Sequence, residues 1–179
     1  QRFCQMQWQV ADNLTDVMGA MVALRDRPCA ARDTIYQSFH DQWQNDLSML
    51  NRWFQLESCA HRDNAVAHVT GLLAHPRFDG KNPNRVRAVV HSFGDQNWLG
   101  FHAGDGAGYT FVADQILRFD AQNPSLASRF CEAFARWHKF SEPARGLQKT
   151  QLGRVAAHQT LSPNVCEIVE KTLKAGATH

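Results

Sequence analysis

Apolar residues recur every three or four positions along most of this 179-residue chain. That spacing gathers them on one face of a helix, whereas a half-buried strand needs apolar and polar residues in alternation. About nine segments carry the pattern, among them Leu14/Val17/Met18/Met21/Val22, Leu47/Leu50/Trp53/Phe54, Val86/Val89/Val90/Phe93 and Leu126/Phe130/Phe134/Trp137. Since no convincing alternating stretch interrupts them, the sequence predicts an all-α protein.

Two Asn-Pro pairs, Asn82-Pro83 and Asn123-Pro124, mark the starts of predicted helices. The Asn side chain can accept a hydrogen bond from an amide of the first turn, and proline at the first position lacks the N–H that would stay unpaired. The pairs lie 41 residues apart, close to the roughly 40 to 47 residues of HEAT or armadillo repeats. We therefore expect stacked antiparallel helix pairs in a HEAT/armadillo-like superhelix, with a compact helical bundle as the alternative.

A glycine-rich segment at residues 104–109, Gly-Asp-Gly-Ala-Gly-Tyr, lies between the two helix starts. A phosphate-binding loop would follow a strand and carry Lys-Ser/Thr after its last glycine, but Tyr109-Thr110 stands there. The segment instead predicts a flexible joint that lets two helices pack closely. We expect Asp105 and Tyr109 to fix this joint, because a carboxylate just ahead of a helix interacts favourably with its N-terminus.

The charge and the cysteine content limit the expected partners of the protein and its cellular compartment. With 19 basic and 17 acidic side chains the net charge is +2, and the basic residues form no long run, so neither nucleic acid nor a membrane surface is an expected partner. No apolar run approaches the roughly 20 residues of a membrane span. The five cysteines are scattered and include no Cys-x-x-Cys pair. They predict free thiols in a cytoplasmic protein, and the length fits one domain, 1–179.

The nine histidines do not have the spacing of a metal site. A helical zinc site needs two histidines three or four residues apart, and no pair here has that spacing. His61, His68 and His75 recur every seven residues, which on one helix would separate neighbours by roughly 10 Å along the axis. We predict a partly exposed helix edge there and no metal ligand. Serine-nucleophile and Cys-His signatures are also absent, so no catalytic residue is predicted.

Three motifs together resemble a known family. They are Asn82-Pro83-Asn84-Arg85, Phe101-His102 followed by Asp105-Gly106-x-Gly108-Tyr109, and Asn123-Pro124-x-x-Ala127-Ser128-Arg129. This sequence resembles, over nearly its whole length, the C-terminal domain of bacterial aminopeptidase N, a zinc-dependent alanyl aminopeptidase of the gluzincin family. The resemblance implies a helical domain of a larger polypeptide that closes over the catalytic domain and contacts peptide substrates.

The same resemblance implies that this chain holds no reaction centre. The family's His-Glu-x-x-His zinc motif and Gly-x-Met-Glu-Asn substrate motif belong to the catalytic domain, and neither occurs here. We therefore expect a chain that is inactive alone and binds no cofactor, with zinc held in the catalytic domain of the parent enzyme. The expected partners are that domain and the peptide substrates.

The resemblance also supplies candidate substrate-binding residues. In the family, the helix that begins with Asn-Pro presents side chains to the catalytic chamber, and the matching positions are Ser125 and Arg129. A spacing of four places both on one helix face. Arg129 is predicted to hold the carbonyls or the C-terminal carboxylate of a peptide, and Ser125 to line the pocket beyond the scissile bond. Asn84 and Arg85 are either a second inward-facing group or the cap and exposed face of their helix.

Two other functions remain open on the residues alone. An autonomous helical-repeat module could bind a peptide or a protein partner in its concave face. A hydrolase that uses the histidines is disfavoured by their spacing. An open reading frame with the zinc motif ahead of Gln1 would favour the aminopeptidase over the binding module.

Overall fold

In the computed structural model, residues 1–176 are described, and within that range the chain forms helices and connecting turns without a strand. The helices fall into two compact units, residues 1–89 and the described residues from 90 onward. Helical periodicity without alternation predicted this class of structure. The all-α prediction is confirmed.

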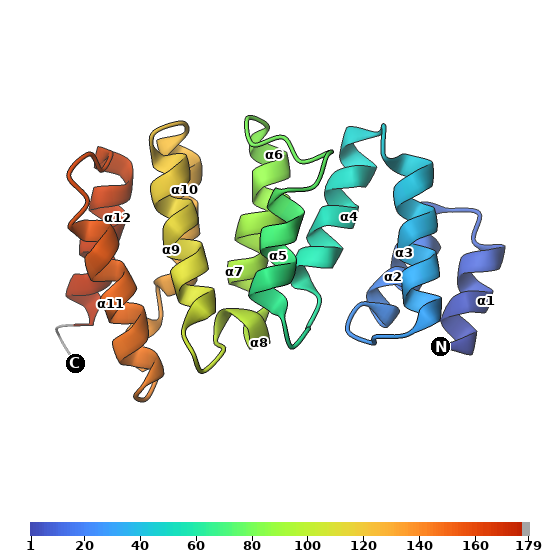
Figure 1. Cartoon of the computed structure of the whole chain (residues 1–179), viewed down its shortest axis with the longest axis horizontal. Helices are drawn as coiled ribbons and strands as arrows, with labels where there is room; N and C mark the ends of the chain where they lie inside the picture. Colours follow the sequence, from blue (N-terminus) through green and yellow to red (C-terminus); the bar gives the residue numbers. More distant parts are fainter. Residues whose placement is uncertain (177–179) are drawn as a thin grey trace. The chain divides into compact units, whose positions relative to one another are not determined.

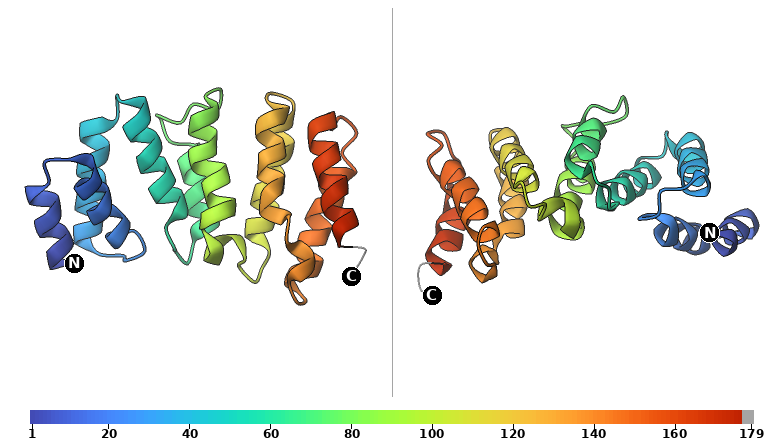
Figure 2. Two further views of the ribbon diagram at one scale, coloured as in Figure 1. Left: turned by 180° about the vertical axis from the view of Figure 1, so that it is seen from behind. Right: turned by 60° about the horizontal axis from the view of Figure 1, so that its bottom comes forward.

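Unit 1 is a series of helices, most of which pack against their neighbours in sequence (Figures 1 and 2). They are α1 (Arg2–Val10), α2 (Leu14–Leu24), α3 (Ala30–Trp43), α4 (Leu47–Cys59), α5 (Ala65–Leu73) and the short α6 (Pro83–Val86). A π-helical segment, Arg87–His91, follows α6, and the boundary between the units falls inside it. Because α1 to α5 each pack on the next helix and α6 packs on α4, unit 1 has the helix-pair organisation that the sequence predicts.

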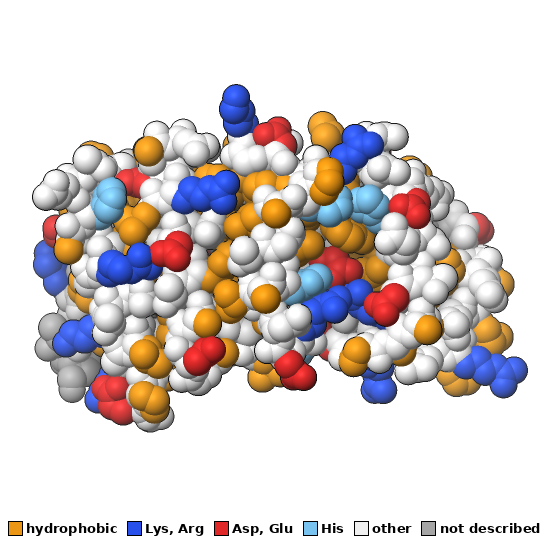
Figure 3. Space-filling model, viewed as in Figure 1, with side chains coloured by type: hydrophobic (Ala, Val, Ile, Leu, Met, Phe, Trp, Pro, Cys, Tyr) orange, Lys and Arg blue, Asp and Glu red, His pale blue; other side chains and the backbone are white. Residues whose placement is uncertain are grey.

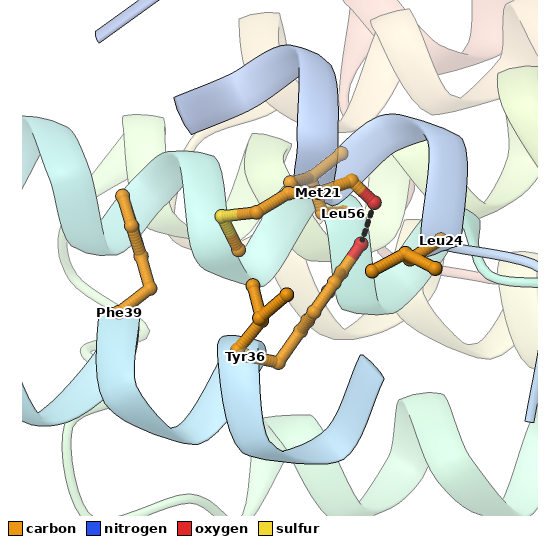
Figure 4. Close-up of a cluster of buried hydrophobic side chains, with 6 residues drawn as sticks. Met21, Leu24, Tyr36, Phe39 and Leu56 are labelled. Carbon is orange, nitrogen blue, oxygen red and sulfur yellow. Dashed lines mark hydrogen bonds between the residues drawn. The ribbon is translucent and has the colours of Figure 1, made fainter. Parts of the chain in front are cut away.

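One apolar cluster in the core of unit 1 lies among α2, α3 and α4. Met21, Leu24, Tyr36, Phe39 and Leu56 are buried there (Figure 4). The Tyr36 hydroxyl donates to the Met21 carbonyl oxygen at 3.0 Å. A buried tyrosine requires such a partner, so this bond allows a large aromatic side chain to occupy the core.

Unit 2 contains two pairs of packed helices and several short turns of helix. The elements are α7 (Ser92–Gln96), α8 (Trp98–Phe101), α9 (Ala107–Asp120), α10 (Pro124–Phe130), 3₁₀ turns at Cys131–Phe134 and Trp137–Lys139, α11 (Ala144–Ala156) and α12 (Pro163–Ala175). Helix α9 packs on α10 and α11, and α12 also packs on α10 and α11 (Figure 1). Consequently α10 is held by helices on two sides.

The joint between α8 and α9 depends on two glycines. Gly106 has φ +72°, a left-handed conformation that side chains disfavour. A Cβ on Gly108 would stand 2.4 Å from the Gly100 carbonyl oxygen and 2.5 Å from that of Phe101. The absence of a side chain therefore lets the start of α9 lie directly against the end of α8, which confirms the predicted close packing.

The Asn-Pro helix starts are confirmed. The Asn82 side chain accepts from the amides of Asn84 and Arg85 at 3.0 and 3.3 Å, and the Asn123 side chain accepts from Leu126 at 3.0 Å. Pro83 and Pro124 occupy the first turn of their helices. Both devices satisfy backbone donors that a helix start leaves unpaired.

The structure differs from the sequence prediction in two segments. Helix α1 was not predicted, because its apolar residues do not lie on one face. The pattern from Leu126 to Trp137 predicted one helix, but α10 ends at Phe130 and two 3₁₀ turns follow. Buried side chains three or four residues apart satisfy either kind of helix, so the spacing cannot distinguish them.

All five cysteines are free thiols, and Cys59 and Cys131 are buried. Within the described residues, every helix is too short or too polar to cross a lipid bilayer.

Candidate functional site

The first candidate surface is the outer face of α10. Leu126, Ala127 and Phe130 are buried and hold the helix in unit 2, whereas Ser125 and Arg129 are both exposed. Their spacing of four residues places them on one face. Among the described residues, the Arg129 guanidinium has neither an ion pair nor a side-chain hydrogen bond. The structure thus offers a fixed helix with a cationic group open to a ligand.

The second candidate is the joint ahead of α9. The Asp105 carboxylate accepts from the Ala107 amide at 2.9 Å and thereby satisfies a donor at the helix start. Tyr109 is buried, and its hydroxyl is hydrogen-bonded to Nδ1 of His102 at 2.8 Å. Burial lowers the pKa of His102 and raises the pKa of Tyr109. Both side chains are therefore neutral near pH 7 and suited to a packed joint.

These two candidates do not form one site. Tyr109 lies in the first turn of α9, and Ser125 lies beyond its C-terminal end at Asp120. A helix of this length spans about 20 Å. The joint and the start of α10 therefore lie near opposite ends of α9.

The Asn84 and Arg85 pair lies in unit 1, and its two members have different environments. Arg85 is only 2% exposed, which excludes a place on an exposed helix face. Its guanidinium donates to Oδ1 of Asn51 at 2.6 Å and to the Arg77 carbonyl oxygen at 2.9 Å, and it lies over the Phe54 ring. Arg85 thus links three segments of unit 1.

Asn84 is exposed and does not cap its helix. Asn82 performs that task, because its side-chain oxygen accepts from the amide of Asn84. The Asn84 side chain instead accepts from Nη1 of Arg87 at 3.3 Å. The interpretation of Asn84 as a helix cap is therefore wrong, because the cap is Asn82.

Sequence reasoning missed a buried charge cluster in unit 1. One carboxylate oxygen of Glu57 accepts from Arg32, His68 and Arg62 at 2.8, 2.9 and 3.0 Å. Burial alone would raise the pKa of Glu57, but the hydrogen bonds from His68 and Arg32 outweigh it and lower the pKa to about 2. Charged and histidine side chains gather over α4 and α5 in Figure 3. No spacing in the sequence indicates this cluster, since Arg32 and Glu57 lie 25 residues apart.

Contrary to the sequence prediction, the three histidines at seven-residue spacing do not lie along one helix edge. Only His68 lies in α5, whereas His61 precedes that helix and His75 follows it. His75 packs its ring against Phe54 and His40, at 5.3 and 5.1 Å between ring centres. Across residues 1–176, no three His, Cys, Asp or Glu side chains come together in an arrangement that could hold a metal ion.

Comparison with known proteins identifies the family. A family of helical ARM-repeat domains, described as "Domain of unknown function (DUF3458_C) ARM repeats", matches residues 1–174. The chain belongs to this family, so the armadillo-like fold prediction is confirmed.

Particular relatives agree with the predicted resemblance. The chain is 37% identical to aminopeptidase N of Caulobacter vibrioides over 91% of its length, and 32% identical to aminopeptidase N of Haemophilus influenzae over 95%. The crystal structure of Legionella pneumophila aminopeptidase A in complex with aspartic acid matches 97% of the chain with a TM-score of 0.88 and 31% identity. The chain spans about a fifth of the length of each of these proteins: 19%, 20% and 20%, respectively. The predicted similarity to a domain of bacterial aminopeptidase N is confirmed.

Proposed function

We propose that this chain is the non-catalytic C-terminal helical domain of a zinc-dependent aminopeptidase N. Residues 1–179 would act as one domain that closes the active-site chamber of the parent enzyme and contacts peptides during removal of N-terminal residues. The family and the relatives of about five times the length support this proposal. Five free cysteines support a cytoplasmic location, where thiols stay reduced.

The observation that carries the proposal is the exposed pair on α10. Helix α10 is anchored by α9 and α12, and its first turn is capped by Asn123. A side chain on such a support loses little freedom when it binds a ligand, so its hydrogen bonds contribute more to affinity. Arg129 presents a planar array of donors that matches a carboxylate or a carbonyl oxygen.

The contribution of this domain to the reaction is positioning. In the proposed parent, the metal-assisted hydrolysis would take place in the catalytic domain. The Arg129 guanidinium would hold the far end of a short peptide, and Ser125 would leave room beside it for a side chain. Correct placement of a substrate lowers the barrier that the catalytic groups must overcome.

The test is Arg129→Ala in the complete enzyme. We expect the Michaelis constant for a tripeptide to rise about tenfold, because a hydrogen bond to a charged group contributes about 1.5 kcal/mol or more. Hydrolysis of an alanyl amide without a C-terminal carboxylate should change much less. Arg136→Ala is the matched control, since Arg136 is also an exposed arginine of unit 2. An unchanged Michaelis constant for the tripeptide would remove Arg129 from the site.

A further inference from the structure

Two Asp-Gly pairs occur in the sequence, Asp79-Gly80 and Asp105-Gly106. At such a pair the glycine amide can attack the carboxyl carbon of the aspartate, because glycine has no side chain to hinder the approach. The product is a five-membered succinimide ring. Water opens this ring either to aspartate or to isoaspartate, in which the chain continues through the former side chain. Each pair could therefore be a site of covalent modification.

The two aspartates have similar surroundings. Both are exposed. Oδ1 of Asp79 accepts from the Lys81 amide at 2.9 Å, and Oδ1 of Asp105 accepts from the Ala107 amide at 2.9 Å. Each bond reaches the backbone two residues further on, as in an Asx-turn. The aspartates thus do not distinguish the two pairs.

The two glycine amides differ. The Gly106 amide donates to the Ala103 carbonyl oxygen at 2.9 Å, and Gly106 is buried at the start of α9. Across residues 1–176, the Gly80 amide has no hydrogen-bond partner, and Gly80 is half-buried in the connection between α5 and α6. An amide that already donates cannot attack until that bond opens. Only Gly80 thus has its attacking atom available in the folded chain.

We propose that Asp79-Gly80 is a site of spontaneous isoaspartate formation in the folded protein and that Asp105-Gly106 is protected. First, the Gly80 nitrogen bonds to Cγ of Asp79 and loses its proton. One carboxylate oxygen leaves as water, with that proton and another from solvent. A solvent water then attacks the Asp79 backbone carbonyl carbon, and the bond from that carbon to the Gly80 nitrogen breaks. The former backbone carbonyl becomes a carboxylate.

The new linkage would change the turn ahead of α6. The Asp79 carbonyl oxygen accepts from the Asn82 amide at 3.2 Å, in addition to the Oδ1 contact with Lys81. Asn82 in turn caps α6. In the isomer the backbone gains an extra carbon atom between residues 79 and 80, so both acceptors of Asp79 must move. The modification therefore falls on a turn that positions a helix start.

The test incubates the complete polypeptide near pH 7 in water enriched in the heavy oxygen isotope. Each ring opening places one heavy oxygen in the carboxylate, and mass spectrometry of peptides gives the rate at each aspartate. We expect Asp79 to gain label at least about tenfold faster than Asp105, because the Gly106 amide must first give up a hydrogen bond. In urea the two rates should become alike. Equal rates in the folded protein, or the same difference in urea, would overturn the proposal.

A pair of variants tests the chemical route. Gly80→Ala places a methyl group beside the attacking nitrogen, and it causes no backbone strain, since Gly106 is the one glycine in the described part of the chain with a positive φ. This variant should gain little label at Asp79. Gly71→Ala, at a helical glycine of unit 1 with space for the methyl group, is the control and should leave the Asp79 rate unchanged. Labelling of Asp79 that survives Gly80→Ala would overturn the proposal. None of these rates depends on Arg129 or on peptide hydrolysis.

Discussion

In the interior of unit 1 the Glu57 carboxylate meets Arg32, and Arg85 lies over an aromatic ring. In the interior of unit 2, the ring of Phe101 meets those of Tyr109 and Phe134 at 5.0 and 5.5 Å between ring centres. Both units have the same helical architecture. They therefore show two ways to fill the space between stacked helices.

The difference determines which changes each unit can tolerate. If one member of a buried ion pair loses its charge, the other member stays buried without a counter-charge. An interior of rings and closely approaching backbone cannot accept added atoms. Unit 2 does bury the Asp120 carboxylate, but it is satisfied by the Ser162 backbone amide and hydroxyl instead of a cation. Unit 1 should thus be the more sensitive to charge, and unit 2 to volume.

The largest effect is expected for Glu57→Gln. The amide keeps the size of the side chain but leaves the buried Arg32 without its main counter-charge, which should cost unit 1 about 3–5 kcal/mol. Urea unfolding followed by hydrogen exchange of peptides from each unit would locate the loss. Glu167→Gln removes an exposed pair with Lys171 and serves as the control, with no measurable change expected.

The pH dependence of the same variant provides an independent check. Since the pKa of Glu57 falls from 4.5 to about 2 on folding, its ionisation stabilises unit 1 fully above about pH 4.5. As the pH falls toward 2, the unfolded chain binds the proton first and this stabilisation is lost. Glu57→Gln should lack that part of the acid sensitivity. If the variant and the natural protein lose stability in parallel, the cluster does not stabilise unit 1.

The corresponding change in unit 2 is Gly108→Ala. One added carbon would meet two carbonyl oxygens at 2.4 and 2.5 Å, so α8 and α9 must separate. Overpacking of this kind costs about 1–3 kcal/mol. The loss should be confined to hydrogen exchange in unit 2. Unchanged protection at the start of α9 would show that the joint adjusts freely.

The smallest effects should be alike in both units. Gly71 of α5 and Gly153 of α11 are helical glycines whose added Cβ would meet no atom within 4 Å. Alanine at either position should stabilise its unit by about 0.5–1 kcal/mol, because glycine loses more backbone entropy in a helix. Equal gains, measured by the shift of the urea midpoint, would show that the contrast between the units lies in their interiors. A gain in one unit only would contradict that conclusion.

The sequence predicted those features of the structure that depend on contacts between residues close together in the chain. Asn82 and Asn123 mark their helix starts through contacts with residues two or three positions away, and such contacts are visible in sequence. The 41-residue spacing of the two Asn-Pro pairs predicted the armadillo-like class, and the family resemblance agreed with it. The α10 pair Ser125 and Arg129 followed from that resemblance, and its substrate role stays a prediction.

Contacts between segments far apart in the chain could not be predicted from the sequence. Arg85 reaches Asn51, 34 residues away, and its burial contradicts the general preference of arginine for the surface. In the sequence alone, Glu57 is typical of an exposed helical residue, because its partners come from other segments. Helix α1 was missed for another reason, since apolar residues on two faces blur the single stripe that periodicity detects.

The two buried cysteines give each unit a reporter of its own. Cys59 lies in unit 1 and Cys131 in unit 2, and burial raises the pKa of Cys131 to about 12. An alkylating reagent attacks the thiolate, so neither group reacts until its surroundings open. Cys4, Cys29 and Cys166 are partly accessible and will be modified first. The order in which the thiols of Cys59 and Cys131 are then alkylated would show which unit of the natural protein opens first.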